Sequence, residues 1–458
     1  MPVPLPPEGD LLPPPDKDEV MITSRACVTA ARGPDGLTDL QYHIWAAHIP
    51  SMTGIHVNPD YLEPMGPEEF AEAMRYRDKG FRIRMVEVML LTAFVLDPVP
   101  YEVIDRIGDY ARELSVDVGM IQIARDQCKG ARVLVDMDSA RAGYSARNDP
   151  AASNDRSNPS PTPAPPTPAA STGADATADA TTDANTDAVI DAVIDPALAA
   201  RWESLGDLAP STLGRKVWEF YRSRGYRFPG TAGSASPYLA QHDWIHVLAE
   251  YGTTVESEVE VFGLISRAND DPAGFALLAM SISLFQSGTI GANDVFGRER
   301  LDLTRNSRKI GIRLADAMYR GAIVAANFGG QDLLAVDWMS MADRDIDEVR
   351  SLMGLPAKSF VTLEHGSVGP WDEGGITSFQ LSAGRSLAAE LGEAYDSFGA
   401  SVAGPERGTR KIVVSINRQA RASAFDELEE SGLLNSVLAR RNLLRGAGPS
   451  EEPVRSTG

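Results

Sequence analysis

The sequence predicts an all-α protein in which a long disordered linker joins two helical domains and a partly disordered tail follows them. Apolar residues recur three and four positions apart through most of the chain, which is the period of an α-helix packed on one face. Glycine or proline separates most of these segments, and the alternation typical of β-strands is scarce. No aromatic residue occurs between Tyr144 and Trp202, so a stretch poor in core-forming residues separates the two helical regions.

The N-terminal part is predicted to form a small helical domain over residues 21–143, after a proline-rich and acidic segment, 1–20, that is expected to be disordered. Proline followed by two acids after Gly66 is typical of a helix start. Apolar stripes at helical spacing over 85–94 and 99–114 predict two further helices of this domain.

Residues 144–195 are predicted to be a flexible linker. The segment 157–172 is rich in proline, serine and alanine, and 174–195 repeats alanine, threonine and aspartate in short units. Such a composition offers too little apolar surface to offset the entropy lost on folding. We therefore expect a tether between the two domains.

A second helical domain is predicted over 196–356, and a partly disordered C-terminal extension over 357–458. In the extension, 411–416 is a short β-like run of uncertain place. The apolar segment 275–285 is either plain core or a wall for an isoprenoid tail, and core is the simpler interpretation. The helices expected after the linker cover residues 213–221, 237–251, 254–268, 272–287, 308–327, 343–353, 380–397 and 424–443.

The formal net charge of −21 argues against nucleic acid as a partner, because an acidic surface repels phosphate backbones. The two cysteines, Cys27 and Cys128, form no C-x-x-C pair, which fits a reducing cytoplasm. We find neither a signal-peptide pattern nor an apolar run of the roughly 20 residues needed to span a bilayer. The protein is therefore expected in the cytoplasm, where it could also bind peripherally to the inner face of the membrane.

Two of the six histidines lie four residues apart, in the segment Gln241-His-Asp-Trp-Ile-His246. On a helix, His242 and His246 share one face, so that two imidazoles can converge on one ion. Asp243 lies between them in sequence and could be a ligand or an acceptor for an imidazole N–H. The plainer alternative is a pair of hydrogen-bonded histidines with Asp243 as a surface acid.

A distant acid completes the pattern. Gly252 is expected to end the helix, and Thr253 with Glu256 is expected to form the capping box of the next one. Two helices joined by so short a turn run antiparallel. His246 precedes Gly252 by six residues and Glu258 follows it by six, which brings them to the same level.

The predicted metal ligands are thus His242, Asp243, His246 and Glu258. Two imidazoles with carboxylates suit Zn²⁺, with Fe²⁺ or Mn²⁺ as alternatives. Four protein ligands would make a closed, structural zinc site, whereas three would leave a position for water or substrate.

The spacing H-D-x-x-H, eleven residues, then E resembles the ubiquinone (coenzyme Q) biosynthesis protein 4 family. The flanks are similar too: Thr212-Leu-Gly214 before the motif, and Asp337-Trp338 with Asp347-Glu-Val-Arg350 after it. The resemblance covers roughly residues 200–356. The N-terminal domain is similar, in size and helix pattern only, to tellurite-resistance TerB-like domains.

The resemblance implies an all-α domain that binds a divalent metal, usually zinc, through His242, Asp243, His246 and Glu258. It implies peripheral membrane association and a role in organising quinone-synthesis enzymes or in oxidative decarboxylation at C1 of a prenylated benzoquinone precursor. The expected partners are an isoprenoid or quinone-precursor lipid and other quinone-synthesis enzymes, with a homodimer as a further candidate. The alternative is a non-catalytic, lipid-binding scaffold whose metal only holds the helical hairpin together.

Overall fold

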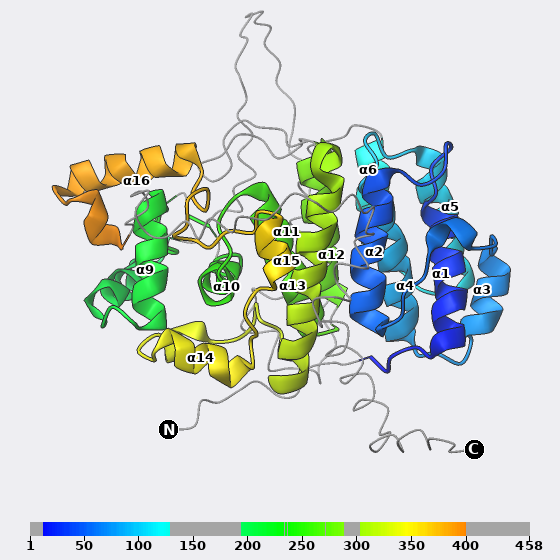
Figure 1. Cartoon of the computed structure of the whole chain (residues 1–458), viewed down its shortest axis with the longest axis horizontal. Coiled ribbons are helices and arrows are strands. Elements are labelled where there is room, and N and C mark those ends of the chain that lie inside the picture. Colours follow the sequence, from blue (N-terminus) through cyan, green and yellow to red (C-terminus); the bar gives the residue numbers. More distant parts are fainter. Residues whose placement is uncertain are drawn as a thin grey trace, which may run out of the picture.

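The computed structural model describes residues 12–128, 194–232, 234–235, 237–270, 272–287 and 303–399 (Figure 1). Within these ranges the chain forms α-helices, 3₁₀ turns and two isolated bridges, and no strand, which confirms the all-α prediction. The linker predicted over 144–195 lies outside the described residues except for its last two positions. The β-like run 411–416 and the helix expected at 424–443 also lie outside them.

Among the residues described up to 128, six α-helices form the N-terminal group. The first begins at Lys17, so the prediction that residues 1–20 are disordered is wrong for 17–20. A capping box starts this helix: the Asp16 carboxylate accepts from the Glu19 N–H, and Glu19 accepts from the Asp16 N–H. The helices are α1 (Lys17–Ala31), α2 (Asp39–Thr53), α3 (Pro67–Met74), α4 (Lys79–Ala93), α5 (Tyr101–Glu113) and α6 (Met120–Cys128).

The described residues from 194 onward contain a second group of helices. Those between 213 and 353 lie near the expected segments, the helix expected over 380–397 spans 378–391, and the helices at 196–203 and 360–364 were not predicted. Three of these helices, α9, α14 and α16, end at a glycine with a left-handed backbone, as helices commonly do; these glycines are Gly225, Gly354 and Gly392. These helices are α8 (Pro196–Glu203), α9 (Leu213–Arg224), α10 (Gln241–Ala249), α11 (Val255–Ala268), α12 (Pro272–Ser287), α13 (Ser307–Asn327), α14 (Ile346–Met353), α15 (Phe360–Glu364) and α16 (Ser378–Leu391).

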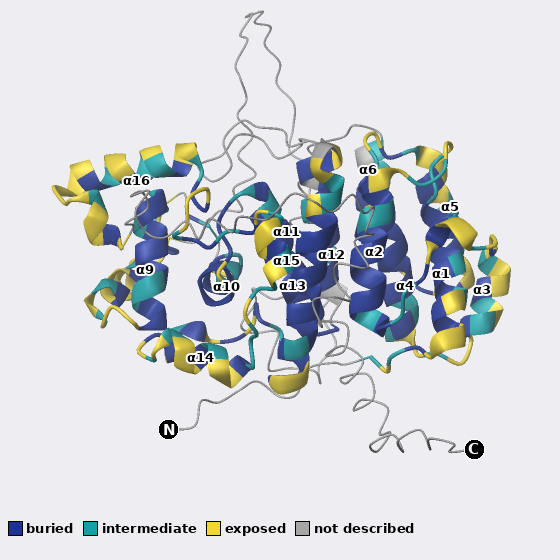
Figure 2. Cartoon of the chain, viewed as in Figure 1, coloured by how far each residue is buried: buried dark blue, intermediate teal, exposed yellow. Residues whose placement is uncertain are grey.

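The two groups pack directly against each other. Helices α2 and α4 contact α13 and α12, and the buried faces of these helices form one continuous core (Figure 2). Gly311 of α13 permits the close approach to α2, because a Cβ there would lie 2.8 Å from the Cβ of His43. Phe275 and Phe285 of α12 are buried, and this helix packs against α11 and α4. This packing favours the core interpretation of segment 275–285 over that of a lipid wall.

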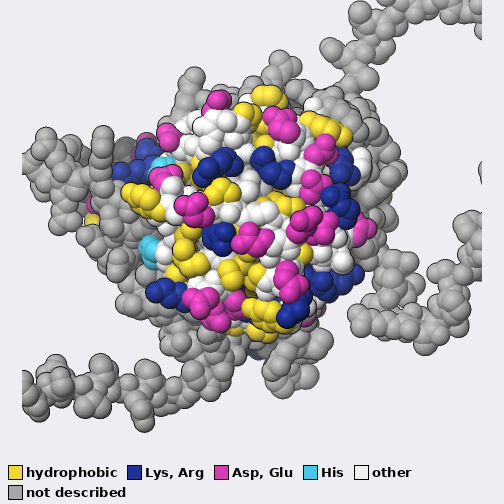
Figure 3. Space-filling model, turned by 90° about the vertical axis from the view of Figure 1, so that its right-hand side faces the viewer, with side chains coloured by type: hydrophobic (Ala, Val, Ile, Leu, Met, Phe, Trp, Pro, Cys, Tyr) yellow, Lys and Arg dark blue, Asp and Glu magenta, His cyan; other side chains and the backbone are white. Residues whose placement is uncertain are grey.

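The outer face of the N-terminal group carries acidic and basic side chains interspersed with apolar ones (Figure 3). Tyr61, Tyr76 and Tyr101 of this group are exposed. Such a mixture is typical of a solvent-facing surface. Among the described residues, no helix combines the length and the apolar character needed to cross a membrane.

Candidate metal centre

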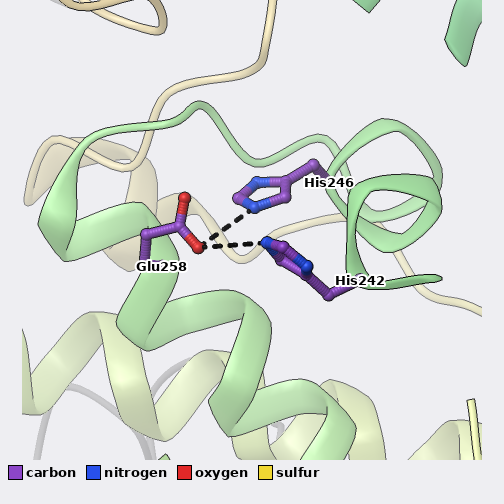
Figure 4. A group of neighbouring side chains, drawn as sticks. All are labelled: His242, His246 and Glu258. Atoms are coloured by element: carbon purple, nitrogen blue, oxygen red, sulfur yellow. Dashed lines mark hydrogen bonds and ion pairs between the residues drawn. The ribbon is translucent and has the colours of Figure 1, made fainter. Parts of the chain in front are cut away.

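Helices α10 and α11 bring three predicted ligands together (Figure 4). A short turn reverses the chain between them, so that Glu258 of α11 faces His242 and His246 of α10. The Glu258 Oε2 atom lies 3.3 Å from Nε2 of His246 and 3.6 Å from Nε2 of His242. One donor atom from each residue lies within 4.8 Å of the other two, an arrangement that could hold a metal ion. The hairpin that the spacing predicts is therefore present.

Backbone carbonyls fix the proton of each imidazole on its outer nitrogen. Nδ1 of His246 lies 2.8 Å from the Gly252 carbonyl oxygen, and Nδ1 of His242 contacts the Leu239 carbonyl oxygen. A carbonyl only accepts hydrogen bonds, so both Nδ1 atoms donate. In the neutral rings both Nε2 lone pairs then face the Glu258 carboxylate, which is the orientation that a shared cation requires.

The turn between the helices differs in detail from the prediction. Helix α10 ends at Ala249, and the residue that caps it is Glu250, with a left-handed backbone at φ 61°, and not Gly252. Helix α11 is capped by Thr254, which accepts from the Ser257 N–H, so the predicted Thr253–Glu256 capping box is absent. Gly252 is needed for a different reason, because a Cβ there would lie 2.7 Å from the Cα of Gly375.

Asp243 lies next to the three converging residues and outside their group. Its Oδ1 is 3.6 Å from Nε2 of His242, and its Oδ2 accepts a hydrogen bond of 2.5 Å from the Tyr221 hydroxyl. Burial and the neighbouring Asp243 charge raise the pKa of Tyr221 well above its ordinary value, so Tyr221 remains a donor. This bond holds the carboxylate beside His242, and a direct role as a ligand stays a prediction.

Aromatic rings enclose the imidazoles. The ring of Phe220 stacks on His246 with centroids 5.5 Å apart, and that of Phe262 stacks on His242 at 5.4 Å. The sequence assigned neither phenylalanine to the site, although Phe220 belongs to the helix expected over 213–221. Apolar rings packed on the imidazoles lower the local dielectric and so strengthen charge interactions within the site.

The buried charges of the site attract a cation. Burial would raise the pKa of Glu258, but the two histidines lower it to about 2. Burial likewise disfavours a charged His242, but Asp243 and Glu258 outweigh it and raise the pKa of His242 to about 9. The two carboxylates thus favour a positive charge at this position.

Three cationic side chains hold the carboxyl end of α10. Arg350 donates to the carbonyls of Val247 and Leu248, Arg320 to that of Ala249, and Lys358 to that of Glu250. These carbonyls have no hydrogen-bond partner inside the helix and lie at the negative end of its dipole. The cationic side chains therefore supply the missing donors and a favourable positive charge. The helix that supplies both histidines is anchored by residues far along the chain.

Comparisons with known proteins identify no relative. No family model matches the sequence, no curated protein matches it, and no solved structure matches the fold. The likeness to the ubiquinone biosynthesis protein 4 family therefore rests on the motif and its flanks alone.

Proposed function

We propose that this protein binds one divalent metal ion through Nε2 of His242, Nε2 of His246 and the carboxylate of Glu258. The observation that carries the proposal is the orientation of the two imidazoles. Each donates its Nδ1 proton to a backbone carbonyl and turns its Nε2 toward the same carboxylate oxygen. Two nitrogen lone pairs and a buried carboxylate oxygen that face the same point repel each other unless a cation lies between them.

Zinc fits this arrangement well. Bonds of about 2.0–2.1 Å at tetrahedral angles place neighbouring ligand atoms about 3.3 Å apart. The separations of 3.3 and 3.6 Å between Glu258 and the histidines are close to that value. Two histidines and one glutamate leave a fourth position for water or substrate, as in catalytic zinc sites. Fe²⁺ and Mn²⁺ are the alternative ions, and Asp243 is the candidate for a fourth ligand.

The substrate class that we propose is a prenylated benzoquinone precursor, in a protein of the ubiquinone biosynthesis protein 4 type. The support is the spacing H-D-x-x-H, eleven residues, then E, together with the convergence of its two histidines and its glutamate. A bound divalent ion would hold and polarise a carboxylate or carbonyl oxygen of such a precursor. We further propose that the protein acts as a homodimer at a membrane surface, together with other quinone-synthesis enzymes.

Oxidative decarboxylation at C1 would break the bond between the ring and its carboxylate, release CO₂ and place a hydroxyl on the ring. O₂ supplies the hydroxyl oxygen in this scheme. A reductant of the nicotinamide or flavin class supplies two electrons, and with three protons the second oxygen atom becomes water. Zn²⁺ carries no redox chemistry, so this reaction favours Fe²⁺ in the site.

A non-catalytic scaffold is the second candidate, and the burial of the ligands favours it. His246 is fully buried and Glu258 is 2% exposed, and the two residues join α10 to α11. A metal at this place would hold the helical hairpin in register and stabilise the folded chain.

Metal analysis and native mass spectrometry of the purified full-length protein, combined with lipid extraction, test the proposal. We expect one divalent ion per chain, which is lost in Glu258→Gln, and a co-extracted quinone or isoprenoid. A wild-type protein that retains no ion and takes up none of Zn²⁺, Fe²⁺ or Mn²⁺ overturns the metal site. Glu258→Ala separates the two functions: an enzyme stays folded without turnover, whereas a scaffold loses stability together with function.

A further inference from the structure

The segment 366–380 lies beyond the region that resembles the family, yet it packs on the turn that links the two ligand helices. The Gly252 N–H donates to the Val368 carbonyl at 2.9 Å, and the Thr253 N–H donates to the Gly375 carbonyl at 2.9 Å. The two backbones approach so closely that a Cβ on Gly252 would lie 2.7 Å from the Cα of Gly375. The turn is thus held by backbone contacts from more than a hundred residues later in the chain.

Arg224, the last residue of α9, connects this segment to the turn. Its Nη2 donates to the carbonyls of Pro370, at 2.8 Å, and Gly375, at 3.3 Å, and its Nε donates to the Thr253 hydroxyl at 3.1 Å. Its Nη1 donates to the Phe220 carbonyl, and the guanidinium lies 3.9 Å from the centroid of the Phe220 ring that stacks on His246.

The Arg224 side chain is fully buried, and each of these acceptors is neutral. Burying a cation without a carboxylate partner is costly, so the bonds must supply a compensating benefit. Burial lowers the pKa of Arg224 to about 10, which leaves it charged at neutral pH.

Thr253 and Gln380 extend the same linkage. The Thr253 hydroxyl donates to Oε1 of Gln380 at 2.6 Å, and Nε2 of Gln380 donates to the Tyr226 hydroxyl at 2.8 Å. Thr253 is free for this role because Thr254, and not Thr253, caps α11. The adjoining residue, Gly252, supplies the carbonyl that receives the Nδ1 proton of His246 at 2.8 Å.

We propose that Arg224 is a positioning residue of the metal centre. By fastening segment 366–380 to Thr253, it holds the Gly252 carbonyl where that carbonyl orients His246 and keeps its Nε2 free for the ion. The C-terminal segment therefore sets the metal affinity, although it supplies no ligand. This inference rests on the proposed metal site. Removing a group that orients a histidine ligand typically weakens metal binding by about 10- to 100-fold.

The test measures Zn²⁺ affinity in the full-length protein by competition with a chromophoric chelator, and the visible absorption spectrum of the Co²⁺-substituted protein. Thr253→Val removes the hydroxyl with little change in shape, and Thr253→Ser restores it. Arg224→Met removes the donors. Arg222→Met is the matched control, because Arg222 lies on the same helix and pairs with Glu203.

We expect Thr253→Val and Arg224→Met to weaken Zn²⁺ binding by about tenfold or more and to alter the Co²⁺ spectrum. Thr253→Ser and Arg222→Met are expected to behave as the wild type. If Thr253→Val lowers the unfolding temperature of the metal-free protein and leaves affinity and spectrum unchanged, the linkage is merely structural and the inference fails. A wild-type protein that binds neither ion refutes the metal site itself, which is a separate result.

Discussion

The proposed metal site predicts a specific difference in thermal stability between the wild type and Glu258→Gln. The Glu258 carboxylate is 2% exposed and lies within 3.6 Å of both imidazole Nε2 atoms. The substitution keeps the shape of the side chain and removes the charge that attracts the ion. A ligand that binds only the folded state stabilises it by RT ln(1 + [L]/Kd).

At a free Zn²⁺ concentration of 1,000 times Kd, this stabilisation is about 4 kcal/mol in the wild type. With an unfolding entropy of about 2.1 cal/mol/K per residue over roughly 300 folded residues, the unfolding temperature rises by about 6 °C. If the glutamine variant binds about a hundredfold more weakly, the same Zn²⁺ concentration stabilises it by about 1.4 kcal/mol, or about 2 °C.

Differential scanning calorimetry with and without Zn²⁺ measures both shifts. Comparing each protein with its own metal-free form cancels any effect of the substitution on the apo state. Glu256→Gln is the control, since it removes the same charge from the same helix at a position outside the ligand group. An equal rise in wild type and Glu258→Gln, or no rise in either, refutes the reasoning.

Three further predictions concern stability, each measured by urea unfolding. Burial lowers the pKa of His48 from 6.5 to about 4, so as the pH falls the unfolded state binds the proton before the folded state does. The contribution of His48 to the free energy of unfolding is therefore complete above pH 6.5 and falls by about 3 kcal/mol by pH 4. His48→Gln should remove this pH dependence. Gly252→Ala forces its Cβ against Gly375 and should cost about 1–3 kcal/mol, whereas no loss would mean that the turn can shift freely. Arg313→Met leaves the fully buried Glu260 without its ion-pair partner at 2.6 Å and should cost about 3–5 kcal/mol; adding Glu260→Gln should restore most of it, and a double variant no more stable than the single one would contradict this account.

Local sequence was sufficient to predict most helices and the ligand hairpin. Apolar spacing indicated α4, α5 and α9 to α14 because a helix that packs on one face must repeat its buried residues at that period. The positions of His246 and Glu258, equidistant from Gly252, predicted that the two side chains would face each other, and they lie 3.3 Å apart. Such a prediction needs only the rise and turn of two short helices.

Boundaries and caps were less predictable from local sequence. Two adjacent threonines could each cap α11, and Thr254 does so because Thr253 bonds to Gln380. Residue Glu250 adopts the left-handed backbone although glycine lies two positions later, since that glycine is required against Gly375. In both cases a contact distant in the chain decided between local alternatives of similar energy.

The sequence by itself predicted the helical fold class and the convergence of His242, His246 and Glu258, whereas the structure places Asp243 outside that group. Only the tertiary structure decided which groups orient them: Arg224, the segment 366–380, and the cations that anchor the end of α10. It also decided that the N-terminal helices cover α12 and α13. The reason is physical, because helical period and spacing act over a few residues, whereas these contacts join parts of the chain that no local rule relates.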